Sequence, residues 1–168
     1  MFMRSRAVPV LFVCVILGAM FWHVPAASAQ TEYVDVPAAG FPLVASSTFL
    51  GNSGVVEVSA AEVLRAAVRL KPALRLCQLK FWAHDFDSND VTLRLMRKNT
   101  GVTGTFGPPP EVVASVSSAG AVDALRAFST TTFTDDFIGA GYFYWVELDF
   151  EGGPIQVSGV RIRTAPTC

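Results

Sequence analysis

Apolar and polar side chains alternate with a period of two in several parts of the chain, a pattern typical of strands with one buried face. The clearest run is residues 142–150 (YFYWVELDF), where every second side chain from the first onward is apolar. Residues 77–84 (CQLKFWAH) and 91–96 (VTLRLM) alternate in the same way. Residues 111–118 and the region around 125–133 are expected to add further strands. The pattern predicts an all-β antiparallel sandwich.

Two short segments rich in turn-forming residues lie between the predicted strands. Residues 85–90 (DFDSND) and 151–154 (EGGP) have the composition of hairpin turns, so each is expected to join two neighbouring strands of one sheet. The second hairpin would place residues 155–163 beside 142–150, with a bulge at Gly159.

Residues 59–70 allow two interpretations. Ser59 and Glu62 match a helix capping box, which predicts a short helix over 60–65. The alternation of apolar and charged side chains at 68–71 favours a strand instead. Both interpretations stay open, and the part after residue 65 is expected to be extended.

The first 29 residues have the features of a secretory signal peptide. Arg4 and Arg6 precede an apolar run at 7–22, and Ala27 and Ala29 fit the small-residue positions of a cleavage site. The run of about 16 residues is shorter than the roughly 20 that a membrane-spanning helix needs. We therefore expect an exported protein, periplasmic or extracellular, with no stable membrane insertion once residues 1–29 are removed.

Beyond the signal peptide, residues 30–40 are expected to be loosely ordered and residues 41–168 to form one β-sandwich domain. The chain has 13 Lys and Arg and 14 Asp and Glu residues; without Arg4 and Arg6 the counts are 11 and 14, a net charge of −3. This acidic balance, with no basic cluster, argues against a nucleic-acid partner.

Removal of the signal peptide also takes away Cys14 and leaves Cys77 and Cys168. An even pair of cysteines in an oxidising compartment predicts a disulfide, which would also hold the C-terminus in place. The alternative is two separate thiols, one within a strand and one at the end of the chain.

Asp85, Asp87 and Asp90 lie close together in a predicted turn, and carboxylates so spaced are ligands that Ca²⁺ accepts. Their spacing differs from that of an EF-hand, which needs a glycine and a distal glutamate. Because Asp and Asn are also ordinary turn residues, a polar turn without metal is the other interpretation. No other cofactor is indicated.

Glu147 and Asp149 fall on the outward face of the predicted strand 142–150, and a carboxylate pair is the catalytic set of glycoside hydrolases. A catalytic acid needs burial to raise its pKa. These two are expected to be solvated and to pair with Arg161 and Arg163 on the next strand, which favours an ion-pair face. No catalytic residue is therefore assigned.

Trp82, Trp145 and Phe143 also fall on outward strand faces. Exposed aromatic rings on a β-sandwich stack on sugar rings or contact another protein. The other interpretation is that a loop, the N-terminal segment or another sheet edge covers them. The three residues are candidates for a ligand or partner surface.

Residues 66–163 carry a further pattern. The segment 70–85 (LKPALRLCQLKFWAHD) leads from a leucine through a proline-containing turn into a strand that ends on aromatics and an aspartate. Residues 91–95 supply a V-x-L-x-L strand, and 159–162 a closing Gly-Val-Arg-Ile. The pattern resembles uncharacterised secreted bacterial β-sandwich proteins. That resemblance implies a jelly-roll-like sandwich and supplies no catalytic residues.

Three functional hypotheses follow. The favoured one is an exported, non-catalytic β-sandwich protein with a structural or interaction role, whose partner is an unknown protein or glycan. The alternative is a small carbohydrate-binding module, with calcium as a supporting ion. The third is a glycoside hydrolase that uses Glu147 and Asp149.

Overall fold

The computed structural model describes residues 30–42, 48–50, 54–86, 88–101, 108–120 and 122–168. Within them the chain forms two antiparallel sheets and one 3-10 turn, η1 (Ala38–Gly40). Sheet A contains β1 (Glu32–Pro37), β2 (Thr48–Leu50), β3 (Val56–Val58), β5 (Arg75–Asp85), β8 (Val122–Thr130) and β10 (Ile155–Ala165). Sheet B contains β4 (Glu62–Val68), β6 (Val91–Asn99), β7 (Glu111–Ser117) and β9 (Tyr142–Phe150). No helix in these ranges is long and apolar enough to cross a membrane.

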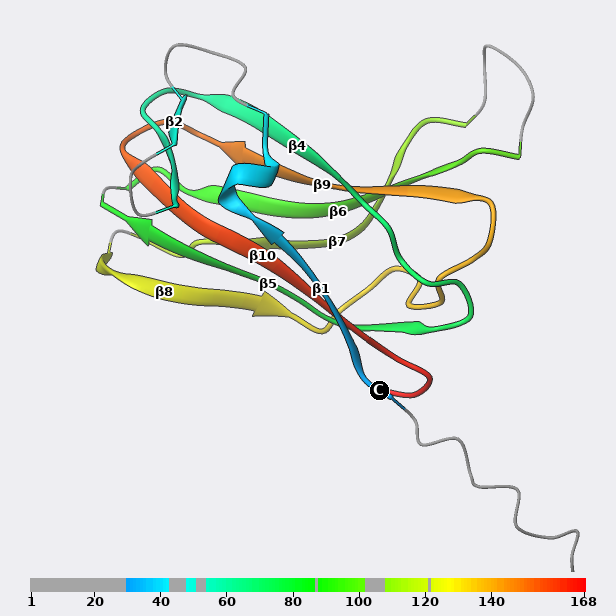
Figure 1. Ribbon diagram of the computed structural model, residues 1–168. Helices are drawn as coiled ribbons and strands as arrows, with labels where there is room; N and C mark the ends of the chain where they lie inside the picture. Colours follow the sequence, from blue (N-terminus) through cyan, green and yellow to red (C-terminus); the bar gives the residue numbers. More distant parts are fainter. Residues whose placement is uncertain (1–29, 43–47, 51–53, 87, 102–107, 121) are drawn as a thin grey trace, which may run out of the picture.

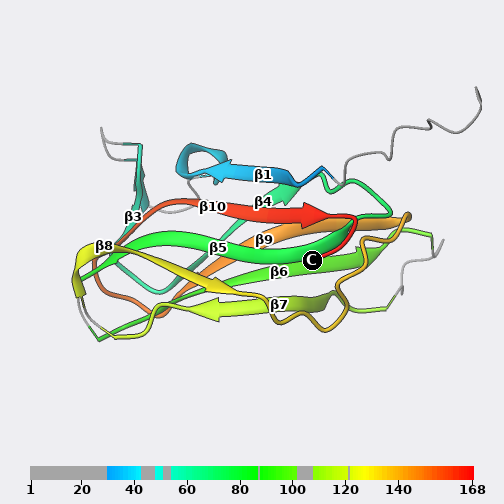
Figure 2. The same ribbon diagram turned by 90° about the horizontal axis from the view of Figure 1, so that it is seen from below.

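The strand order defines the two layers. Sheet A runs β2-β3-β10-β5-β8, and β1 pairs with β10 beyond the short stretch that pairs with β3. Sheet B runs β4-β9-β6-β7. Figure 1 shows β1 alongside β10, and Figure 2 shows β1 near one edge of the molecule and β7 and β8 near the other. The expected all-β, jelly-roll-like antiparallel sandwich is confirmed.

The inward side chains of both sheets meet in one apolar core. Phe81 of β5 and Phe150 of β9 are among its largest fully buried side chains. Burying one such side chain contributes roughly 1.5–3 kcal/mol. Most of the inward positions that the alternating pattern predicted are buried: Cys77, Leu79, Phe81, Ala83, Val91, Leu93, Leu95, Tyr144, Val146, Leu148 and Phe150. Tyr142, the first of the predicted inward positions of β9, is half-buried and packs against the core.

The two predicted hairpins are wrong. β5 lies in sheet A and β6 in sheet B, so the chain between them passes from one sheet to the other. Residues 151–154 likewise connect β9 of sheet B to β10 of sheet A. Turn-forming residues are compatible with a hairpin within one sheet and with a connection between two sheets. Which sheet the next strand joins depends on its pairing with strands far away in the sequence.

The short helix over 60–65 is also wrong, since these residues lead into and form part of β4. β4 pairs with β9 from Glu62 opposite Phe150 to Val68 opposite Tyr144. The pairing buries alternate apolar side chains of β4 against the core. A capping box is a local signal worth about 1 kcal/mol, and here the long-range ladder and burial outweigh it.

Residues 30–40 differ from the loosely ordered segment that was expected. Glu32–Pro37 is β1, which pairs with β10 along six residues. Val36 and Ala38 are buried and belong to the core cluster. Their burial supplies the apolar contact that holds this N-terminal segment against sheet A.

Gly159 allows β1 to approach β10 closely. The register of β10 against β5 shifts between Val157 and Gly159, which confirms the predicted bulge. A Cβ atom on Gly159 would lie 3.0 Å from the carbonyl oxygen of Val36. Glycine therefore suits this position because the backbone of β1 occupies the space of a side chain.

A disulfide joins Cys77 of β5 to Cys168, which lies just past the end of β10, and it confirms the predicted pairing. The two cysteines are separated by 91 positions in the sequence. Cys77 is buried, whereas Cys168 is exposed. The bridge therefore fastens the C-terminal segment to a central strand of sheet A.

Replacing Cys168 by alanine is expected to lower the free energy of unfolding by about 2–4 kcal/mol, because the bridge restricts a long loop of the unfolded chain. The substituted side chain is exposed, so the core stays intact. Urea unfolding of the oxidised protein and the variant measures the difference. Equal midpoints with equal slopes would show that the bridge does not stabilise the fold.

Candidate functional site

β9 places two aromatic side chains on the outer face of sheet B. The strand lies between β4 and β6, and its residues Tyr144 and Val146 point into the core. Phe143 and Trp145 therefore point outward. Their rings stack with centroids 5.7 Å apart, and Phe143 is 49% exposed. These two residues are called the platform below.

Two shallow hollows adjoin the platform. One, of about 330 Å³, is lined by Arg65, Ala67, Lys98, Phe143 and Trp145. The other, of about 540 Å³, shares Ala67 and Phe143 with the first and extends along residues 67–70 and 142–144. Hollows of this size are typical of sites for small molecules or short segments of a polymer.

The surroundings of Trp145 hold its ring in one orientation. In register, Trp145 lies opposite Ala67 of β4 and Met96 of β6. The small side chain of Ala67 leaves room beside the ring, whereas Met96 is almost fully buried. The indole Nε1 donates a hydrogen bond of 2.8 Å to Oε1 of Glu147. The platform is therefore preorganised, so a ligand does not have to order it.

Glu147 differs from the solvated carboxylate that was expected. It is only 8% exposed, and its Oε1 also accepts a hydrogen bond of 2.9 Å from Nε of Arg65. The predicted partners Arg161 and Arg163 are wrong, because β4 and β6, rather than β10, are the neighbours of β9. The second outward carboxylate, Asp149, accepts a hydrogen bond of 2.7 Å from Arg94 of β6.

The two carboxylates of the hydrolase hypothesis are thus each tied to a separate arginine. A catalytic acid of a glycosidase is typically placed in apolar surroundings that keep it neutral. Glu147 and Asp149 instead take part in an ion-pair face, as the sequence predicted, although with different arginines. The geometry gives catalysis by this pair no support.

Trp82 lies on the other sheet and does not join the platform. On the outer face of sheet A, the guanidinium of Arg161 lies 5.5 Å from the ring centroid of Trp82 and 5.3 Å from that of Tyr33. Lys80 Nζ lies 4.8 Å from the Trp82 centroid. Arg161 also donates to Asp35 at 2.6 Å. Cations already contact the Trp82 ring, so the three predicted aromatic residues form two separate surfaces.

The described members of the acidic turn make internal contacts. Asp85 is 1% exposed, and its Oδ2 accepts a hydrogen bond of 2.7 Å from Ser118 Oγ. Asp90 Oδ1 accepts one of 3.2 Å from the Gly120 amide, and Asp87 lies outside the described residues. Among the residues that the structure describes, no group of three or more His, Cys, Asp or Glu is placed to hold a metal ion. Calcium binding at this turn stays a prediction.

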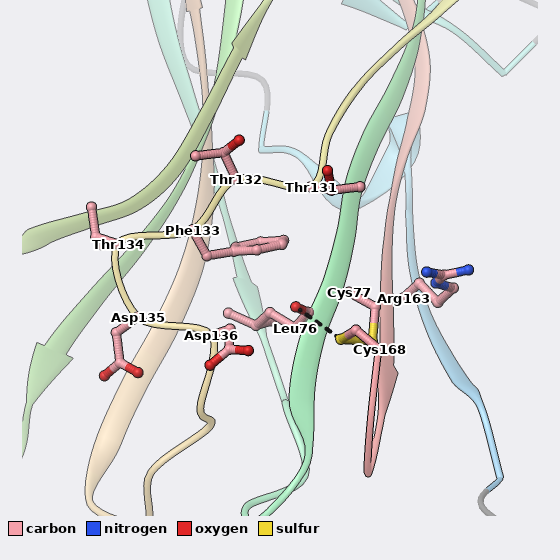
Figure 3. A pocket seen from close by; sticks show the side chains of 10 residues that line it. All are labelled: Leu76, Cys77, Thr131, Thr132, Phe133, Thr134, Asp135, Asp136, Arg163 and Cys168. Atoms are coloured by element: carbon pink, nitrogen blue, oxygen red, sulfur yellow. Dashed lines mark hydrogen bonds between the residues drawn. A yellow bond between two sulfur atoms is a disulfide. The ribbon is translucent and has the colours of Figure 1, made fainter.

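A third hollow, of about 570 Å³, lies beside the disulfide. Figure 3 shows the disulfide on one side of it and Asp135 and Asp136 on the other. Asp136 accepts a hydrogen bond of 2.8 Å from Arg75, and Asp135 accepts one of 2.7 Å from Arg97. These ion pairs fasten the segment between β8 and β9 across the end of the sandwich, which indicates a structural role.

Arg97 forms one of the ion pairs that hold the segment between β8 and β9 in place. Its side chain is 12% exposed and donates hydrogen bonds to Asp135 and, at 2.9 Å, to Glu111. The guanidinium group also lies 4.8 Å from the ring centroid of Tyr142. The hydrogen bond from Arg97 lowers the pKa of the Asp135 carboxyl below its ordinary value. The charged form of Asp135 therefore contributes to the stability of the fold.

Neither a protein-family model nor a curated protein matches the sequence. Among solved structures, the chain is similar to the C-terminal CBM6 of LamC, a marine laminarinase from Zobellia galactanivorans, with a TM-score of 0.50 and 12% identity. That match covers 78% of this chain and 98% of the other.

The chain is also similar to the CBM22-1–GH10 modules of endo-1,4-β-D-xylanase 10B from Clostridium thermocellum, complexed with xylohexaose. The TM-score is 0.51 at 12% identity, over 81% of this chain and 28% of the other. At these identities the likeness concerns the β-sandwich fold alone. The resemblance to uncharacterised secreted proteins is thus supported for its fold, and the rest of it stays a prediction.

Three cations at the platform were not among the predicted site residues: Arg65, Arg69 and Lys98. Each lies at an outward position of an alternating pattern, which was the available signal. The pattern around Arg65 was partly assigned to a helix, and nothing local indicated that β4 and β6 flank β9. The arrangement of these cations around the aromatic rings depends on strand order, which is a non-local property.

Replacing Asp135 by asparagine is expected to destabilise the protein at pH 7 by less than about 1 kcal/mol, because the carboxylate is 45% exposed. The folded-state pKa is lowered, so the stabilisation is fully present above the ordinary aspartate pKa and is lost as pH falls through the lowered value. The difference between the two proteins should therefore shrink as the pH falls below the ordinary aspartate pKa and through the lowered one. Urea unfolding at several pH values measures it, and a difference that stays constant would contradict the assignment.

Proposed function

We propose that this protein is a non-catalytic carbohydrate-binding module that holds sugar rings against Phe143 and Trp145. The proposal is carried by the stacked outward pair beside a hollow of about 330 Å³. The C–H face of a sugar ring packs against an aromatic face, and both surfaces then leave water. The likeness of the fold to the LamC module supports the same function.

Polar groups at the margin of the platform supply hydrogen-bond donors, which the aromatic rings lack. Arg65 is 63% exposed and uses Nε for Glu147; within the described part of the chain its Nη1 and Nη2 donate no hydrogen bond. Lys98 is exposed beside Phe143. Sugar hydroxyls accept hydrogen bonds from such donors, and a few well-placed polar groups give a mostly apolar site its specificity.

A general structural or protein-interaction role is less favoured by this surface. A stable protein–protein interface buries about 800 Å² on each partner around a centre depleted of charge. Here, charged side chains of Arg65 and Lys98 line the same small hollow as the two rings. A surface of this kind suits a ligand that is narrow, polar at its edges and apolar on its faces, as a sugar polymer is.

Replacing Trp145 by alanine is expected to weaken glycan binding by at least about 30-fold, or 2 kcal/mol, as loss of a central aromatic anchor does. Soluble β-glucans and xylan oligosaccharides serve as first probes. Isothermal titration calorimetry gives the Kd of the purified protein and the variant, and thermal unfolding checks that the variant is folded.

Phe143→Ala is the second variant, because that side chain is half exposed and its loss leaves the core unchanged. Tyr33→Ala is the matched control: it removes an aromatic ring that is 57% exposed on the opposite sheet and should leave the Kd unchanged. Equal affinities for Trp145→Ala, Phe143→Ala and the unmodified protein would exclude the platform as the glycan site.

The proposed function also includes export, in agreement with the disulfide and with the sequence features of residues 1–29. N-terminal sequencing of the protein recovered from the periplasm or the medium should begin near Gln30. Recovery of the folded protein with Met1 retained would contradict removal of the signal peptide.

A further inference from the structure

The charged side chains that line the two hollows beside the platform have one sign. They are Arg65, Arg69 and Lys98. We infer that the ligand of this surface is an anionic sugar polymer whose acidic groups, uronic-acid carboxylates in the first place, face these cations. The inference rests on the glycan-binding function proposed above and specifies the class of glycan.

The surface carries an excess of positive charge. Glu147, the acidic side chain that contacts the platform, is matched by its hydrogen bond from Arg65. Lys98 and Arg69 are both exposed, and neither forms an ion pair with any residue of the described ranges. Within the described part of the chain these two cations therefore have no counter-charge, although residues 30–168 as a whole have a net charge of −3.

Some exposed cations elsewhere on the molecule have carboxylate partners. Lys71 donates to Glu32 at 2.8 Å, and Arg161 donates to Asp35 at 2.6 Å. Those side chains are also exposed to solvent, yet each has a carboxylate partner within the chain. Arg126 of β8 is also exposed and forms no ion pair within the described residues, so unpaired charge alone does not distinguish the platform face. Lys98 and Arg69 differ from it in that they line hollows beside two stacked aromatic rings, an arrangement complementary to an acidic sugar polymer.

The strand order places the cations on both sides of the aromatic rings. Lys98 of β6 lies opposite Phe143, and Arg65 of β4 lies opposite Glu147. β4 and β6 flank β9, so their backbones are about 10 Å apart. A polymer lying on the rings meets a cation at each of its edges.

The two kinds of cation suit carboxylates in different ways. Nη1 and Nη2 of Arg65, which donate no hydrogen bond to any described residue, form a planar fork that matches the two oxygens of a carboxylate, while Lys98 acts as a point charge. A neutral polymer would cover this surface and leave Lys98 and Arg69 unmatched. A carboxylate would supply the counter-charge to these exposed cations beside the apolar platform.

The test compares acidic polymers with their neutral counterparts: polygalacturonate with its methyl ester, and dextran sulfate with dextran. We expect polygalacturonate to bind at least about tenfold more tightly than its ester, and added NaCl to reduce this preference. Lys98→Gln and Arg69→Gln should each weaken polygalacturonate binding about three- to fivefold, as loss of one partly exposed charge contact does. Arg126→Gln, at an exposed position of β8 on the other sheet, makes the same change in charge away from the platform and should have no effect.

The outcomes separate the inference from the function on which it rests. A preference for polygalacturonate alone supports carboxylate recognition, and a preference for both acidic polymers supports recognition of anionic sugars in general. Equal binding of acidic and neutral forms, with Trp145→Ala abolishing both, overturns the inference and leaves the proposed function standing. A preference that Lys98→Gln and Arg69→Gln do not reduce overturns it as well. If no glycan binds, both are overturned.

Discussion

Burial of one face of each sheet decides which side chains this protein presents to its surroundings. A strand in a sandwich buries every second residue, so the residues between them face solvent whatever their chemistry. Tyr144 and Val146 fill the core, and Phe143 and Trp145 are outside for that reason. A slip of β9 by one residue would bury Trp145 and expose Val146. The surface aromatic pair is therefore maintained by the same packing that stabilises the fold.

The period-two pattern predicted the strands of the core well because inward and outward positions are local properties of a strand. The turn residues between the strands, in contrast, led to two hairpin predictions that are wrong. The segments after β5 and after β9 have ordinary turn residues, yet they join different sheets, because each strand finds its partners at long range. The helix prediction over 60–65 is wrong for a related reason. The local capping signal is outweighed by the hydrogen-bonded pairing of β4 with β9, a strand some eighty residues further along the chain.

The candidate binding surface could also be predicted in part from the alternation of side chains. The alternation predicts which aromatic residues face outward, but it does not predict which of them lie together on one sheet. Trp82 and Trp145 have similar sequence surroundings and lie on opposite sheets, one in contact with Arg161 and Lys80 and the other stacked on Phe143. Likewise, alternation predicted an ion-pair face on β9, and only the strand order shows that Arg65 and Arg94 supply it.

The pairing of β1 with β10 and the disulfide together have a mechanical consequence. Glu32 at the start of β1 lies opposite Thr164 near the end of β10, so a force applied at these two ends separates the strands one pair at a time (Figure 1). The Cys77–Cys168 bond diverts a pull on the C-terminal segment into β5, which is held by β10 on one side and β8 on the other. Tension at the C-terminal end is thus resisted by several paired strands of sheet A. Tension at the N-terminal end acts on β1 alone and separates it from β10.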